Sequence, residues 1–121
     1  MAEKRIQSFQ EFWPFYLGEH RNPRNRRLHY IGTGLVISVL MFSLISQRYV
    51  FLLLLPCLGY GFAWVGHFKV ELNRPATFTY PIWSLLADFK MFFLAILGRM
   101  PAEMIKFYGS VEPDKNTPRL Q

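Results

Sequence analysis

The sequence predicts an all-α integral membrane protein: a transmembrane helical hairpin, with an aromatic helix before it and a third apolar helix after it. The main observation is a pair of adjacent apolar segments, 28–47 and 49–68, each twenty residues long without Asp, Glu, Lys or Arg. At about 1.5 Å per residue, a helix of that length spans a hydrocarbon core of about 30 Å. The alternative is the buried hairpin of a soluble bundle, but 121 residues offer too little surface to cover two such helices.

Composition excludes several other classes of protein. Hydrophobic residues make up 51% of the chain and charged residues only 18%, which argues against a disordered protein. A single cysteine, Cys57, rules out a disulfide scaffold and Cys-based zinc motifs. We therefore expect one membrane domain over residues 1–110, followed by a flexible tail over 111–121.

The first element is an aromatic helix near the N-terminus. Ser8-x-x-Glu11 resembles a capping box and opens the stretch FQEFWPFYLGEH, which Pro14 interrupts. Aromatic side chains favour the headgroup level of a membrane, so this helix is expected at the interface. Asn22 and Pro23 then form a helix start, with Asn as the N-cap and Pro at the first helical position.

The remaining elements follow the hairpin. Asn73-Arg74-Pro75 ends the second spanning helix. Pro81 opens a third apolar helix over about 82–98, which Gly98 and Pro101 stop. Because this helix is short and carries Asp88 and Lys90, we expect it to be tilted, re-entrant or interfacial and packed on the hairpin.

The net charge of +6 fits membrane topology. Arg48 lies at the hairpin tip, whereas the open end is flanked by eight basic residues: Lys4, Arg5, Arg21, Arg24, Arg26, Arg27, Lys69 and Arg74. The positive-inside rule therefore places the open end in the cytoplasm, at the inner membrane of a bacterium or the endoplasmic reticulum of a eukaryote. No basic helix is left to suggest a nucleic-acid partner. The oligomeric state is not indicated.

Three histidines, His20, His29 and His67, are the most informative polar residues. With the tip near Arg48, antiparallel pairing places residue 29 opposite residue 67 at the open end. His20 comes only a few residues before the first spanning helix and can fold back to the same place. The sequence thus predicts that all three imidazoles meet at one membrane boundary.

Other polar side chains share this end of the hairpin. Asn25 precedes His29 by four residues and His67 precedes Glu71 by four, so each pair shares a helix face, and Asn73 follows closely. Polar groups at this depth are costly unless paired, and neutral imidazoles suit Fe(II) or Zn(II). Alternatively, the histidines only satisfy helix ends, and Glu71 pairs with a surface cation.

Two polar blocks resemble a known family. The pattern His20-x4-Asn25-x3-His29-x2-Gly32, followed by Trp64-x-Gly66-His67-x3-Glu71-x-Asn73-x-Pro75-Ala76, is similar to the family of the yeast 2-hydroxy fatty acid dioxygenase, long catalogued as a domain of unknown function. The segments FWPFYLGEHRNP and YPIWSLLADFKMF also resemble it, so the likeness covers residues 8–98. It implies an Fe(II)-dependent membrane enzyme of fatty acid α-oxidation. Such an enzyme converts a 2-hydroxy long-chain fatty acid and O2 into the acid one carbon shorter plus CO2.

On this resemblance we expect His20, His29 and His67 to be metal ligands, and Glu71 to be a fourth catalytic-site ligand or a supporting residue. Asn25 and Asn73 would orient the imidazoles or the substrate, and an arginine such as Arg21 or Arg74 would pair with the substrate carboxylate. Two alternatives remain: a zinc-dependent lipid hydrolase that uses the same residues, and a non-catalytic membrane protein for lipid binding or assembly.

Overall fold

The computed structural model describes residues 5–113, and within them every regular element is a helix. The order is α1 (Phe9–Gly18), α2 (Pro23–Ser46), η1 (Tyr49–Leu54), α3 (Leu55–Val65), η2 (Gly66–Glu71), η3 (Ala76–Phe78), α4 (Pro81–Ile96) and α5 (Met100–Tyr108). The prediction of an all-α fold is confirmed. The predicted tail lies mostly outside the described residues.

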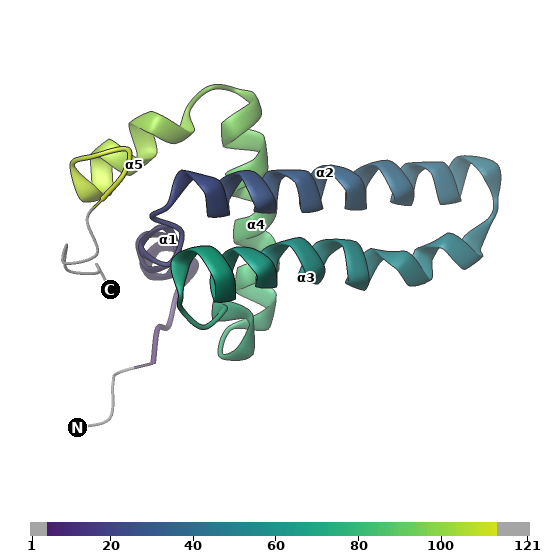
Figure 1. The fold of residues 1–121 in the computed structure, drawn as a ribbon, viewed down its shortest axis with the longest axis horizontal. Helices are drawn as coiled ribbons and strands as arrows, with labels where there is room; N and C mark the ends of the chain where they lie inside the picture. The colour runs from purple at the N-terminus through teal and green to yellow at the C-terminus, as the bar shows by residue number, and fades with distance from the viewer. Residues whose placement is uncertain (1–4, 114–121) are drawn as a thin grey trace.

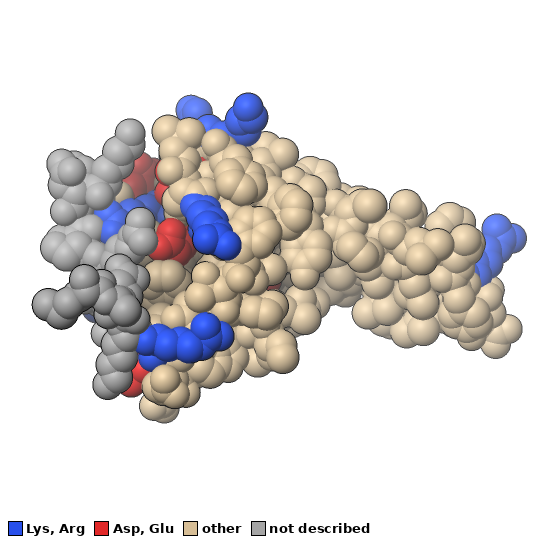
Figure 2. All heavy atoms as spheres, turned by 90° about the horizontal axis from the view of Figure 1, so that it is seen from below, with Lys and Arg blue, Asp and Glu red and all other residues tan. Residues whose placement is uncertain are grey.

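The long hairpin is the dominant feature. Helix α2 runs out to the tip, and η1, α3 and η2 return beside it as one continuous rod (Figure 1). Both arms, Pro23–Ser46 and Tyr49–Glu71, are long and apolar enough to cross a membrane. Charged side chains gather at the open end of the hairpin and reappear only at its tip (Figure 2).

Local sequence signals explain both arms. Asn22 caps α2, with its side-chain oxygen accepting from the Arg24 N–H at 2.9 Å, and Pro23 follows as the first helical residue. On the returning arm, Pro56 lies in the first turn of α3, where no backbone N–H is required. Gly32 allows the arms to approach closely, because a Cβ there would lie 3.1 Å from the Leu58 carbonyl oxygen and from the Phe62 Cβ.

The third apolar helix crosses the hairpin. Figure 1 shows α4 passing behind the open half of the hairpin, nearly at right angles to α2 and α3. Helices α4 and α5 are long and apolar enough to span only if taken together, and they meet at a bend of 117°. This arrangement agrees with the predicted tilted or interfacial helix packed on the hairpin.

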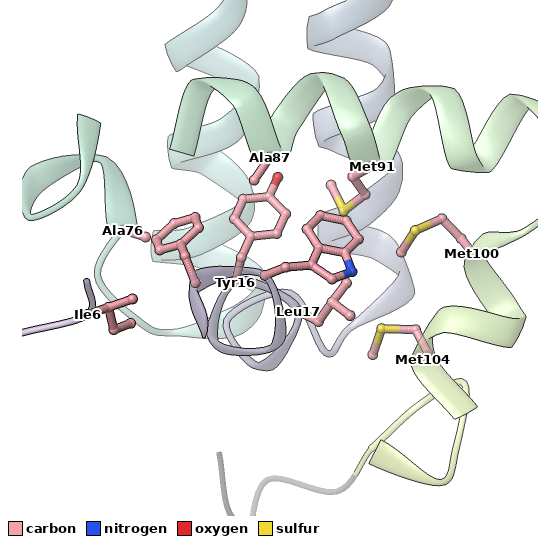
Figure 3. Close-up of a cluster of buried hydrophobic side chains, with 10 residues drawn as sticks. Ile6, Tyr16, Leu17, Ala76, Ala87, Met91, Met100 and Met104 are labelled. Atoms are coloured by element: carbon pink, nitrogen blue, oxygen red, sulfur yellow. The ribbon is translucent and has the colours of Figure 1, made fainter. Parts of the chain in front are cut away.

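Helix α1 fills the space enclosed by α4, α5 and the base of the hairpin. Its Tyr16 and Leu17 are buried among side chains of the later elements (Figure 3): Ala76, Ala87, Met91, Met100 and Met104. Pro14 lies inside the helix without ending it, and the Pro14 carbonyl accepts from the Tyr108 hydroxyl at 2.7 Å. The aromatic face predicted for the headgroup level is therefore largely covered by protein, since α4 and α5 pack over it.

Candidate metal centre

The three histidines meet at the open end of the hairpin. His20 follows α1, His29 is in the second turn of α2, and His67 is on η2. Their ring centroids are 4.4 Å, 4.5 Å and 5.0 Å apart, and one ring nitrogen of each lies within 4.8 Å of the others. Relative exposures of 1%, 4% and 2% show that all three are buried. The predicted convergence is confirmed.

Each imidazole is held through its Nδ1 atom. His20 Nδ1 lies 2.7 Å from the Tyr16 carbonyl oxygen and His29 Nδ1 lies 2.9 Å from the Asn25 carbonyl oxygen. His67 Nδ1 lies 2.7 Å from the side-chain oxygen of Asn73. Because oxygens of this kind only accept, all three Nδ1 atoms must carry the proton. This leaves the Nε2 lone pairs available to a ligand, as in many metal-binding histidines.

The contact between His20 and His29 favours a cation between the two rings. Their Nε2 atoms are 3.1 Å apart, and with both Nδ1 atoms protonated each neutral ring presents a lone pair to the other. Burial, together with the neighbouring His29 and His67, holds the pKa of His20 well below its usual value, so protonation of His20 does not relieve the repulsion at neutral pH. Metal–nitrogen bonds of about 2.0–2.1 Å suit nitrogens at this separation. The donor set therefore fits a transition-metal ion.

The backbone around His67 explains how Asn73 reaches it. Element η2 is a π-helical turn, a wider helix that often occurs at functional sites. Leu72 then adopts a left-handed conformation with φ of 59°, which reverses the chain and lets the Asn73 N–H donate to the His67 carbonyl at 2.9 Å. The Asn73 amide nitrogen donates to the Glu19 carboxylate at 2.7 Å, which fixes the amide with its oxygen toward His67.

Gly66 is required for the close contact between η2 and α2. A Cβ on Gly66 would lie 1.9 Å from the side-chain oxygen of Asn25, whose side chain is fully buried. Asn25 therefore occupies the space that any larger residue at position 66 would need. This packing sets the distance between His29, one turn after Asn25, and His67, next to Gly66.

Arg26 holds the segment that carries His20, a role that sequence reasoning missed. Its guanidinium donates to the carbonyls of His20 at 2.7 Å, Arg21 at 2.9 Å and Val111 at 2.9 Å. It is 5% exposed. Sequence reasoning counted Arg26 among the basic residues around the open end and did not predict this structural role, because its three carbonyl partners are brought together by tertiary structure.

A small cavity lies against the three imidazoles and has further polar walls from α1 and α4. Its lining includes Tyr16, Ser84 and Asp88 beside the histidines. The Tyr16 hydroxyl donates to the Asp88 carboxylate, and burial followed by the Asp88 charge raises the pKa of Tyr16 well above its usual value. The buried Ser84 hydroxyl has no hydrogen-bond partner among the described residues. Tyr16, Ser84 and Asp88 were not predicted as site residues; for Tyr16, its spacing of four residues from His20 was the available signal.

The other predicted site residues surround this centre. The Glu71 carboxylate accepts from the Asn22 backbone N–H, and the metal-binding group found among the described residues consists of the three histidines. Arg21 donates to the Gly18 carbonyl at 3.0 Å and lies over Tyr108, while the exposed Arg74 lies over Phe78. The roles of Glu71 in metal binding and of either arginine in substrate binding stay predictions.

Fold and site together define the class: an α-helical protein with membrane-spanning helices and a buried three-histidine centre that can bind a metal ion. A family model described as "2-hydroxy-palmitic acid dioxygenase Mpo1-like" matches residues 6–100. The chain therefore belongs to the Mpo1-like family, as the sequence motifs indicated. No curated protein and no solved structure matches the chain.

Proposed function

We propose that this protein is an Fe(II)-dependent membrane dioxygenase that shortens a 2-hydroxy long-chain fatty acid by one carbon. The proposal is carried by the pair of Nε2 atoms that face each other at 3.1 Å, with His67 beside them. His20, His29 and His67 would be the protein ligands of the metal. Three ligands leave coordination positions open, and iron so bound would supply the redox chemistry that oxygen activation needs.

The reaction class follows from the family description together with the chemistry of the substrate. A 2-hydroxy acid can chelate a metal through one carboxylate oxygen and its hydroxyl oxygen. The conversion RCH(OH)COOH + O2 → RCOOH + CO2 + H2O balances without a reductant or a second organic substrate. The polar end of the hairpin is also where an amphiphilic acid in a bilayer presents its headgroup.

The polar side chains that line the cavity match the chemistry of the substrate headgroup. In the proposed site the Asp88 carboxylate, aligned by the Tyr16 hydroxyl, accepts the proton of the substrate hydroxyl. Ser84, which has no other described partner, donates to the substrate carboxylate. Asn73 orients His67 by accepting a hydrogen bond from its Nδ1 atom. Glu71 links η2 to the start of α2, because its carboxylate accepts a hydrogen bond from the Asn22 N–H.

We also place this centre at the cytoplasmic boundary of the membrane. The basic residues of the described open end support this orientation, since Arg48 is the only Lys or Arg between Arg27 and Lys69. A site on this side would receive its substrate from the cytoplasmic leaflet.

The deciding experiment loads the full chain in lipid nanodiscs with Fe(II) under anaerobic conditions. Addition of 2-hydroxypalmitate and O2 should then release pentadecanoate and CO2 in equal amounts, with one O2 consumed for each. His67→Ala should lose bound iron and product together, because it removes one of three ligands. Cys57→Ser, on an exposed position of α3, serves as the matched control and should keep both.

Two results would contradict the proposal. One is full pentadecanoate production by His67→Ala. The other is a protein that retains zinc under all conditions, hydrolyses lipid esters and never consumes oxygen, which would identify the hydrolase instead.

A further inference from the structure

A second cavity begins at the metal centre and runs along the hairpin into its apolar region. It has a volume of about 220 Å³. His29 and Asp88 line both this cavity and the small one against the imidazoles, so the two spaces adjoin at these residues. We call the larger cavity the hairpin groove.

Three helix faces form the groove. Helix α2 contributes Thr33 and Val36, which follow His29 on one face at helical spacing. The returning arm contributes Gly59 and Tyr60 opposite them. The remaining lining residues are Leu55, Pro56, Leu85 and Phe89.

Polarity changes along the groove in one direction. The polar lining residues His29, Thr33 and Asp88 lie toward the metal centre, whereas the α2 wall ends at Val36 and the far part of the returning arm is apolar. From His29 to Val36 the groove follows α2 for about 10 Å, at about 1.5 Å per residue. Tyr60 and Leu85, on its rim, are exposed on the outer surface, so the groove is open sideways toward the bilayer.

We propose that the hairpin groove binds the acyl chain of the 2-hydroxy acid while its headgroup occupies the metal centre. This inference rests on the proposed function and adds the part of the protein that binds the alkyl chain and sets the preferred chain length. The occupant should have a polar head joined to an apolar tail, because the groove adjoins the polar cavity at His29 and Asp88 and is apolar at its other end. The chain enters laterally from lipid and lies between α2 and α3, above α4.

The bilayer already removes the chain from water, so the groove contributes orientation more than affinity. It holds the chain along α2 and thereby fixes C2 of the substrate beside Asp88 and His29. The preferred length of the acyl chain then depends on how far along the hairpin the groove stays open. Gly59 is the residue that controls the open length of the groove. A Cβ at Gly59 would lie 3.4 Å from the Val36 methyl on the opposite wall, so a longer side chain there closes the groove.

The test uses 2-hydroxypalmitate with a diazirine near the middle of its chain, added to Fe(II)-loaded protein in nanodiscs without oxygen. Illumination should label groove residues such as Val36 and Tyr60, as read by peptide mass spectrometry. Gly59→Leu should lower this labelling severalfold. Gly61→Leu is the matched control, because a Cβ at Gly61 meets nothing within 4 Å, and it should label like the wild type.

Turnover gives the second readout. Gly59→Leu should lower kcat/KM for 2-hydroxypalmitate by about tenfold or more, the scale of added methylenes in a tight pocket, while that for 2-hydroxyoctanoate changes little. Val36→Phe, from the opposite wall, should repeat the pattern if Gly59→Leu fails to fold.

Labelling concentrated on outward residues such as Ile45 and Leu53, or equal losses in the Gly59 and Gly61 variants, would overturn the groove assignment. Equal labelling by a diazirine palmitate without the hydroxyl would also overturn it, since the groove would then accept any lipid chain. If turnover is normal but the diazirine labels residues outside the groove, the groove assignment is refuted and the proposed reaction stands. Groove labelling without pentadecanoate formation refutes the proposed reaction alone.

Discussion

Single hydrogen bonds decide the chemistry of the centre at the residue scale. Each histidine donates its Nδ1 hydrogen bond to an oxygen of a different segment. The acceptors are the α1 backbone, the α2 backbone and the Asn73 side chain. This arrangement fixes the tautomer and the direction of every ring before a metal arrives. Of the three partners, only Asn73 can be changed by mutation without altering the backbone.

Asn73→Ala should therefore weaken metal binding without removing a ligand. The expected loss of Fe(II) affinity is about 10–100-fold, because His67 loses its orienting acceptor and the link to Glu19 disappears. Isothermal titration of the metal-free protein with Fe(II) or Co(II) measures it. Lys69→Ala, an exposed change on the same turn, should leave the affinity unchanged. Wild-type affinity in Asn73→Ala would show that His67 is positioned by other contacts.

Asp88 offers a test of proton transfer separate from metal binding. Asp88→Asn should keep the metal and lower kcat by about 10²–10⁴-fold, since the amide cannot take the proton of the substrate hydroxyl. Metal content and single-turnover rates in the same samples separate the two effects. Glu103→Gln, the same chemical change on α5, is the control. Loss of metal from Asp88→Asn, or an unchanged rate, would contradict the assigned role.

At the element scale, the site depends on how closely two helices approach. The π-helical turn η2 carries His67. Gly66, at the start of this turn, has no side chain, so the Asn25 side chain packs directly against its backbone. The hairpin could be predicted from the sequence, because the length of each segment without charged residues is read directly from consecutive positions. The π-helical geometry could not, because it depends on the left-handed Leu72 and on the return of Asn73 to His67.

Gly66→Ala should accordingly separate His29 from His67. The added methyl overlaps the buried Asn25 amide, and overpacking of this kind costs about 1–3 kcal/mol. We expect a lower thermal midpoint in detergent and reduced metal content. Gly61→Ala, on the open side of α3, should change neither. Equal thermal midpoints and equal metal contents in the two variants would mean that the two arms of the hairpin can move apart without loss of stability.

At the scale of the whole molecule, the polar chemistry gathers at one end of an elongated protein. Helices α1, α4 and α5 enclose the open end of the hairpin, whereas its outer part extends alone (Figure 1). Pairing across the hairpin allowed the histidine cluster to be predicted from the chain alone. The link from Tyr16 to Asp88 could not be predicted, because it depends on α4 crossing the hairpin over α1.

Membrane topology can be tested on the full chain. In a Cys57→Ser background, Arg48→Cys and Lys69→Cys place one thiol at the tip and one at the open end. In intact cells, a membrane-impermeant maleimide should label the tip and spare the open end, because the proposed orientation places the basic open end in the cytoplasm. Lysis should expose both positions. Labelling of Lys69→Cys in intact cells would reverse the orientation.

The one-sided placement of the centre also bears on lipid thickness. A hairpin in a thicker or thinner bilayer adapts by tilting or by moving its free tip, at a cost of a fraction of a kcal/mol per ångström of mismatch. The histidines are anchored at the opposite end by α1 and α4, so their depth below the headgroups stays the same. The proposed metal centre can therefore keep its depth in membranes of different thickness, while the outer turns of the hairpin take up the mismatch.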